Sequence, residues 1–136
     1  MTRTPLNFVY HTGGGRSCGQ DCASRAVAIA MRKSYKSAVE LFRHAGENPA
    51  TGVLTDVFFD VMDELGWEYF QTPKTTLCRE DFPRTKKSII VSLRGHVCVV
   101  RNWTVYDTFH PSPDGEKRMY GYWVYLRKKR RRSNAK

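Results

Sequence analysis

Cys22 stands where a glycine-rich loop gives way to an alanine-rich segment. Gly13-Gly14-Gly15 precedes it, and Ala23 to Ala30 follows it with small apolar residues that favour a helix. The positive end of a helix dipole stabilises a thiolate, which lowers the pKa of a cysteine placed there. The sequence therefore predicts Cys22 as a nucleophile at a helix N-terminus. Cys18, in the loop before the helix, is the less favoured rival.

His96 and Asp107 supply a possible base on two consecutive predicted strands, 95–100 and 104–109. With residues 101 and 102 as a two-residue turn, the two side chains lie directly opposite each other. With residues 102 and 103 as the turn, the side chains of His96 and Asp107 lie diagonally on the same face of the hairpin. Only a three-residue turn would put them on opposite faces. A carboxylate beside an imidazole fixes its tautomer and raises its basicity, which is the role expected of Asp107. Asn102 is the alternative third member, and its expected position in the turn makes it less suitable.

Two other kinds of site fit the sequence less well. A zinc site built from Cys18, Cys22, His11 and His96 lacks the closely spaced cysteine pair of structural zinc sites. A nucleotide site at the three glycines lacks the lysine and the Ser/Thr of a Walker motif, and it does not match the dinucleotide fingerprint. We therefore expect no metal and no cofactor.

Three helices are expected in the first half of the chain. The first runs from Asp21 or Cys22 to Met31, with the Asp21 carboxylate capping its first turn. The second begins at Ser37, which forms a capping box with Glu40, and it stops at Gly46. The third has one continuous apolar face and ends at a glycine in the position after its last turn. That face comprises Leu54, Val57, Phe58, Val61, Met62 and Leu65, and the glycine is Gly66.

Strands are expected mainly in the second half. The β-branched and aromatic runs that predict them are 67–71, 88–93, 95–100, 104–109 and 119–126, with a short strand at 8–10. Helices followed by a mostly antiparallel sheet are typical of an α+β domain. The nucleophile helix comes first and packs on the sheet.

Length and composition fit a single domain, residues 1–126, followed by a basic tail, 127–136. An apolar share of 40% and a charged share of 26% are typical of a globular chain. No apolar run approaches the ~20 residues that cross a bilayer, and the N-terminal residues lack the apolar core of a secretory signal. We expect a cytoplasmic protein without a disulfide framework, in which Cys78 and Cys98 are buried or incidental thiols.

The net charge of +10 indicates an attraction to polyanions. Six cations form one block after the last apolar segment: Arg127, Lys128, Lys129, Arg130, Arg131 and Arg132. The block is typical of a tail that binds nucleic acid or an acidic protein. It is equally typical of a solubilising chain end.

The order of these residues leads to a family resemblance. Gln20-Asp21-Cys22 entering a helix, with Gly95-His96-Val97 and Val105-Tyr106-Asp107-Thr108 on adjacent strands, resembles the papain-like cysteine peptidase superfamily. Small phage-encoded members are the most similar, and the bacteriocin-processing peptidase domains of ABC exporters are similar more distantly. The resemblance covers roughly residues 16–125. It implies a minimal papain-like fold in which Cys22 is the nucleophile, His96 the general base and acid, and Asp107 the residue that orients His96.

The family also implies an oxyanion hole formed by the Cys22 amide and a side-chain donor. The family's glutamine usually lies several residues before the cysteine, and the position six residues before Cys22 is Arg16. Gln20, two residues before it, and Arg16 are the two candidates. Loss of one such donor typically costs ~3 kcal/mol of transition-state stabilisation.

Two hypotheses follow. In the first, the chain is a papain-like hydrolase that cleaves a peptide or isopeptide bond through a thioester on Cys22. In the second, it is a catalytically weak or inactive scaffold of the same fold whose basic surface binds nucleic acid or an acidic host protein. The resemblance to phage proteins implies, for either, an effector that acts on a host protein in the host cytoplasm.

Overall fold

The structure is a computed structural model that describes residues 3–14, 21–46, 53 and 55–126. The elements run in the order β1 (Asn7–Tyr10), α1 (Cys22–Met31), α2 (Tyr35–His44), α3 (Thr55–Glu64), β2 (Trp67–Gln71), β3 (Ile89–Leu93), β4 (His96–Arg101), β5 (Thr104–Asp107) and β6 (Gly121–Tyr125). Helices precede most of the sheet, which confirms the predicted α+β class. In these residues no helix is both long and apolar enough to span a membrane.

The strands form one six-stranded sheet in the order β1-β5-β4-β3-β6-β2. Four of the five pairings are antiparallel, and the fifth joins β1 to β5 in parallel, with Asn7 opposite Thr104 and Tyr10 opposite Asp107. The sequence predicted a short strand here but not its partner, because a parallel pairing across this distance leaves no local signal. The strand that carries Asp107 is therefore held on both sides.

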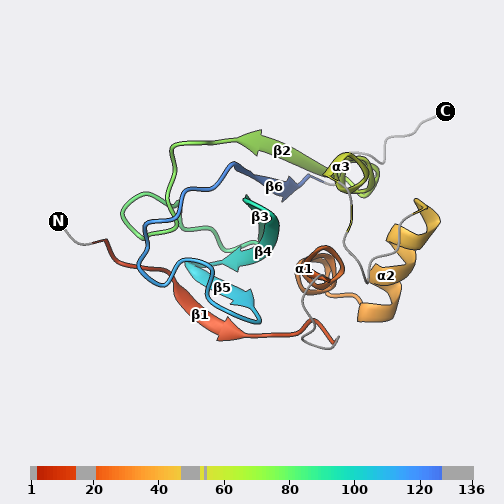
Figure 1. Cartoon of the computed structure of the whole chain (residues 1–136), viewed down its shortest axis with the longest axis horizontal. Coiled ribbons are helices and arrows are strands. Elements are labelled where there is room, and N and C mark those ends of the chain that lie inside the picture. Colours follow the sequence, from red (N-terminus) through yellow and green to blue (C-terminus); the bar gives the residue numbers. More distant parts are fainter. Residues whose placement is uncertain (1–2, 15–20, 47–52, 54, 127–136) are drawn as a thin grey trace.

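Apolar side chains cover both faces of the sheet. On one face the helices pack against Ile90, Val99 and Trp123, and α1 lies between β4 and α2 (Figure 1). On the other face Val91, Cys98 and other strand residues pack under the connections that contain Leu77, Phe82 and Met119. Successive residues of β3 and β4 alternate between the two clusters, as the two-residue period of a strand requires.

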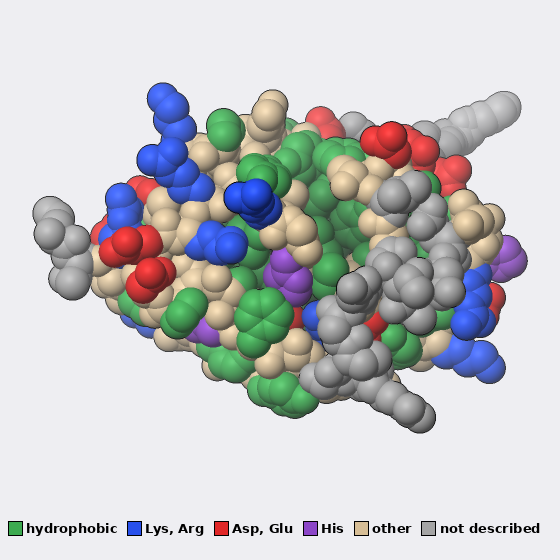
Figure 2. Space-filling view, viewed as in Figure 1, with side chains coloured by type: hydrophobic (Ala, Val, Ile, Leu, Met, Phe, Trp, Pro, Cys, Tyr) green, Lys and Arg blue, Asp and Glu red, His purple; other side chains and the backbone are tan. Residues whose placement is uncertain are grey.

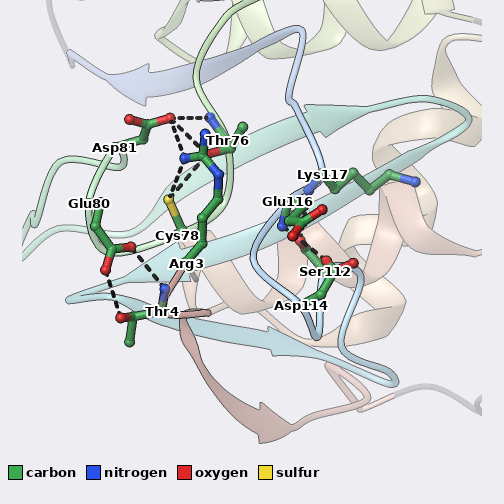
Figure 3. A network of polar contacts seen from close by, with 10 residues as sticks. All are labelled: Arg3, Thr4, Thr76, Cys78, Glu80, Asp81, Ser112, Asp114, Glu116 and Lys117. Atoms are coloured by element: carbon green, nitrogen blue, oxygen red, sulfur yellow. Dashed lines mark hydrogen bonds and ion pairs between the residues drawn. The ribbon is translucent and has the colours of Figure 1, made fainter. Parts of the chain in front are cut away.

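Arg3 and Thr4 link the start of the chain to the connection between β2 and β3. The Arg3 guanidinium donates to Thr76 at 3.1 Å and lies 3.3 Å from the Asp81 carboxylate (Figure 3). The Thr4 amide and hydroxyl donate to the two oxygens of Glu80, at 2.9 and 2.7 Å. These contacts fix the path of the chain into β1.

The β4–β5 hairpin has the second of the two registers that place His96 and Asp107 on one face. Val99 pairs with Tyr106 and Arg101 with Thr104, so the turn consists of Asn102 and Trp103. Both turn residues have positive φ, 53° and 62°, as a type I′ turn requires. This register places the two side chains diagonally across the hairpin.

Two predicted helix caps are wrong, and each has a physical reason. The second helix begins one turn earlier than expected, because Ser34 caps it and accepts the Ser37 amide at 3.1 Å. Asp21 is the N-cap of α1, but its carboxylate forms no capping bond. It binds Arg25 and the Tyr35 hydroxyl instead, which are stronger partners in a buried site. Gly66 ends the third helix as predicted, with φ of 98° and its amide bound to the Asp63 carbonyl.

Candidate active site

The three predicted residues come from the ends of three elements. Cys22 is the first residue of α1, His96 the first of β4, and Asp107 the last of β5. Because α1 packs on β4, the helix N-terminus lies beside the start of that strand. The structure thus brings together the three residues that the sequence singled out.

The imidazole of His96 is held between a carboxylate and a thiol. Its Nε2 lies 2.6 Å from Oδ2 of Asp107, which is almost completely buried. The ring also interacts with the Cys22 thiol. Because Nε2 is occupied by Asp107, Nδ1 is the nitrogen available to Cys22. The carboxylate therefore selects the tautomer in which Nδ1 can accept a proton from sulfur.

The pKa values of the two partners shift in opposite directions. Burial alone lowers the pKa of His96, but its hydrogen bonds with Asp107 and Cys22 outweigh burial and raise the pKa to about 9. Burial alone raises the pKa of Cys22, but the hydrogen bond with His96 and the nearby positive charges outweigh it and bring the pKa below its ordinary value. A thiolate–imidazolium pair is therefore favoured between the two pKa values.

A buried arginine completes the polar centre. Arg25, one turn after Cys22 in α1, is 3% exposed and binds the Asp21 carboxylate. Its Nη2 also lies 3.4 Å from Oδ1 of Asp107, the oxygen that accepts the Thr108 amide at 2.7 Å. The Tyr35 hydroxyl donates to the second oxygen of Asp21 at 2.8 Å. His96, Asp107, Arg25, Asp21 and Tyr35 thus form one continuous network that sequence reasoning missed.

Glycines in the loop before α1 allow the backbone to approach this network closely. Gly13 has φ of 70°, and a Cβ there would lie 3.1 Å from the Arg25 carbonyl oxygen. Gly14 has φ of 97°, and a Cβ there would lie 3.3 Å from Cβ of Tyr35. Because Gly13 and Gly14 have no side chains, the backbone of the loop can pack closely against Arg25 of α1 and Tyr35 of α2. The glycines of this loop therefore have a structural role.

Two further contacts shape the surroundings of Cys22 and His96. The Val97 amide hydrogen-bonds the Cys22 sulfur and helps to lower its pKa. The exposed ring of Phe109 lies over the imidazole of His96, with centroids 4.9 Å apart and planes at 36°. Phe109 lies two residues after Asp107, and its spacing alone gave no signal of this contact.

A cleft of about 350 Å³ opens beside the nucleophile. Cys22 and His96 form part of its wall, and the remainder is mostly apolar, including Val53, Phe59 and Trp123. A volume in this range suits a side chain or small ligand. The cleft therefore offers an apolar side chain a place next to the thiol.

The other cysteines differ from Cys22 in their surroundings. Cys98 is buried in the core, and burial raises its pKa well above the ordinary value. Cys78 is buried too, with its sulfur 3.1 Å from the Thr76 hydroxyl and 3.4 Å from Arg3. Among the described cysteines, Cys22 alone combines partial exposure with a lowered pKa.

Several predicted residues lie outside the described part of the chain. These are Arg16 and Gln20, the oxyanion candidates; Cys18, the rival nucleophile; and the basic block Arg127, Lys128, Lys129, Arg130, Arg131 and Arg132. No group of three or more His, Cys, Asp or Glu side chains within the described residues could hold a metal ion.

Comparisons with protein-family models, with curated proteins and with solved structures found no match to this chain.

Proposed function

We propose that the protein is a papain-like cysteine hydrolase that cleaves an amide bond, in a peptide or an isopeptide. The observation that carries this proposal is the 2.6 Å contact of His96 Nε2 with Asp107, made while the same ring interacts with Cys22. The nucleophile Cys22 thus interacts with the base His96, and His96 in turn contacts the orienting carboxylate of Asp107. Placement of Cys22 at the first residue of α1 adds the helix dipole to the forces that favour its thiolate.

The residues support a two-step reaction. In the first step the Cys22 thiolate attacks the carbonyl carbon of the amide, and the His96 imidazolium gives its proton to the leaving nitrogen. The C–N bond breaks, the amine departs and a thioester remains on Cys22. In the second step neutral His96 takes a proton from water as the hydroxide oxygen attacks the thioester. The C–S bond breaks, the carboxylic acid product leaves, and the Cys22 thiolate is restored beside the His96 imidazolium.

Charge develops on the carbonyl oxygen in both steps. The backbone N–H of Cys22, at the N-terminus of α1, is a donor that no residue of the helix itself can satisfy. The second donor would come from Gln20 or Arg16, as the sequence suggests. The Asp107 carboxylate stabilises the imidazolium by its contact with Nε2.

The reactivity of Cys22 tests this proposal. We would measure the rate of Cys22 alkylation by iodoacetamide against pH, by mass spectrometry, in the parent and in His96→Ala. The expected result is rapid labelling well below pH ~8.5, the pKa of an ordinary thiol, with that labelling lost in the variant. Cys98 in the same samples is the internal control, and we expect it to stay unlabelled while the protein is folded.

Two outcomes would contradict the proposal. One is a Cys22 profile that rises only above pH ~8.5 and is unchanged in His96→Ala, which would mean an ordinary thiol without a base. The other is labelling of Cys18 in preference to Cys22 at low pH. In that case Cys18 would be the nucleophile, and the position of Cys22 at the start of α1 would not account for the reactivity of the protein.

A further inference from the structure

A second hollow lies at the opposite ends of the two elements that carry Cys22 and His96. α1 ends at Met31, beside Arg32, and β4 ends at Arg101. Both arginines line a cavity of about 590 Å³. A helix of ten residues is about 15 Å long, so the hollow is separated from the nucleophile by roughly that distance. It is a site distinct from the candidate active site.

Four cations stand among mostly apolar residues in the wall of this hollow, which we call the basic groove. Arg32, Lys86, Lys87 and Arg101 line it, and its lining includes no Asp or Glu. In the described part of the chain, none of the four is paired with a carboxylate. Their charges are therefore available to a ligand.

Four cations without a neighbouring acid are more than the nearly balanced charge of residues 1–126 would place together by chance. Seven of the 23 basic residues lie in 127–136, which leaves 16 basic against 13 acidic side chains in the rest of the chain. On the face shown in Figure 2, basic and acidic side chains stand near one another at both ends of the molecule. A groove with four cations and no acid differs from that mixed surface.

The groove also presents an exposed aromatic ring and a guanidinium that is held in place. Tyr125 is 40% exposed at its rim, with its ring 5.4 Å from that of Trp67 beneath it. Arg101 is held in place, because its guanidinium lies 4.8 Å from the centre of the Tyr106 ring and donates to the Tyr106 hydroxyl at 3.1 Å.

We propose that the basic groove binds single-stranded nucleic acid. The four cations contact backbone phosphates, and the exposed ring of Tyr125 stacks on a base, the combination by which proteins bind single strands without reading their sequence. A concave site of this volume accepts a base turned into it. A duplex keeps its bases stacked inside and offers only phosphates to such a hollow. This proposal does not depend on the hydrolase proposal.

The test compares two matched charge reversals in the full-length chain. One is the double variant Lys86→Glu with Lys87→Glu, and the other is Lys74→Glu with Lys117→Glu, two exposed lysines outside the groove. Both double variants have the same net charge. Binding of a fluorescein-labelled oligothymidylate is measured by anisotropy over a range of salt concentrations. Thermal unfolding midpoints show that each variant is folded.

We expect the groove variant to bind about tenfold more weakly than the parent, and the control variant within about twofold of it. Loss of two phosphate contacts should also reduce the slope of log K against log salt by about 1.4. Tyr125→Ala should weaken binding by at least about fivefold through the lost stacking. The rate of Cys22 alkylation should stay unchanged in all of these variants, which separates the groove from the candidate active site.

Three results would overturn the proposal. Equal losses in the two double variants would show that only total charge matters. Parent-like binding by the groove variant, with binding abolished when the six cations of 127–132 are replaced by serine, would assign the binding to the tail. Equal competition by duplex DNA or by polyglutamate would show that the groove does not prefer a single nucleic-acid strand.

Discussion

Arg25 Nη2 lies 3.4 Å from Oδ1 of Asp107, and the other oxygen of that carboxylate contacts His96. Oδ1 also accepts the Thr108 amide, so each carboxylate oxygen has its own partners. A carboxylate bound in this way cannot rotate without losing a contact. Arg25 is thus a positioning residue: it acts on the imidazole through Asp107.

Removal of the Arg25 charge should destabilise the protein strongly. In Arg25→Met, Asp21 and Asp107 remain buried without their cation, and loss of one partner of a buried ion pair typically costs about 3–5 kcal/mol. The matched control is Arg43→Met, which breaks an exposed pair with Glu40 of the same 3.4 Å length and should cost less than about 1 kcal/mol. Urea unfolding measures both. Similar small losses in the two variants would mean that the buried network contributes little.

Replacement of Asp107 by asparagine should lower the pKa of His96. The parent imidazole should titrate at about 9, because its contacts with Asp107 and Cys22 outweigh burial. Without the carboxylate, only the interaction with Cys22 opposes the lowering effect of burial, so the pKa of His96 falls. Long-range ¹H–¹⁵N NMR of the imidazole nitrogens measures both titrations. An unchanged pKa in Asp107→Asn would show that Asp107 does not control His96.

The raised pKa of His96 should also make stability depend on pH. A group whose pKa is higher in the folded state stabilises the fold below its unfolded pKa, here 6.5, and this contribution is lost as pH rises through about 9. In a Cys22→Ser background, which removes the coupled thiol and its part of the shift, the unfolding free energy should still fall as pH rises above 6.5, because Asp107 continues to raise the pKa of His96. The same titration in Cys22→Ser with Asp107→Asn should be flatter. If the unfolding free energy depends on pH to the same degree with and without Asp107, the pH dependence does not come from the His96–Asp107 contact.

The apolar cleft beside Cys22 should give the thiol a preference among alkylating reagents. A chloromethyl ketone with a leucine side chain should react faster than one with a glutamate side chain, because the wall next to Cys22 is mostly apolar. Val53→Asp should reduce this preference and leave the iodoacetamide rate unchanged, since iodoacetamide has no side chain to place. Equal rates for the two ketones in the parent would show that the cleft does not select the substrate.

Gly121 should tolerate no side chain. A Cβ at this position would lie 2.4 Å from the Phe70 carbonyl oxygen and 2.5 Å from the Tyr69 ring, so Gly121→Ala forces β2 away from β6. Overpacking of this kind typically costs about 1–3 kcal/mol. Gly46→Ala is the comparison, because open space surrounds Gly46 and only its φ of 89° opposes a side chain. Thermal unfolding of the two variants should rank Gly121→Ala as the less stable.

The juxtaposition of Cys22, His96 and Asp107 could be predicted because its signals are local. A cysteine between a glycine-rich loop and an alanine-rich segment marks a helix start, and the spacing of His96 and Asp107 fixes their face of the hairpin for either two-residue turn. Arg25 could not be recognised in this way. It reads as an ordinary charge on a small apolar helix, and its role depends on Asp107, far away in the sequence. The one available hint was its spacing of four residues from Asp21.

The missing capping bond of Asp21 also depends on residues that are distant in the sequence or hidden by the fold. Asp21 has the residue type of an N-cap, but its burial beside Arg25 and Tyr35 gives the carboxylate stronger partners than the free amides of the helix. The parallel pairing of β1 with β5 could not be predicted either, since it joins residues about a hundred positions apart. Local propensity decides where an element forms, and tertiary contacts decide what it binds.

The position of β1 has a practical consequence for work on this protein. The Asn7 amide bonds the Trp103 carbonyl and the His11 amide bonds the carbonyl of Asp107, both at 2.8 Å, so β1 flanks the whole of β5. A tag, fusion or protease cut that displaces residues 3–11 would loosen the strand that carries the orienting carboxylate. A preparation of that kind would be unreactive at Cys22 although none of Cys22, His96 and Asp107 had changed, and it would be mistaken for evidence against the proposed hydrolase. Expression designs should therefore leave the start of the chain unmodified.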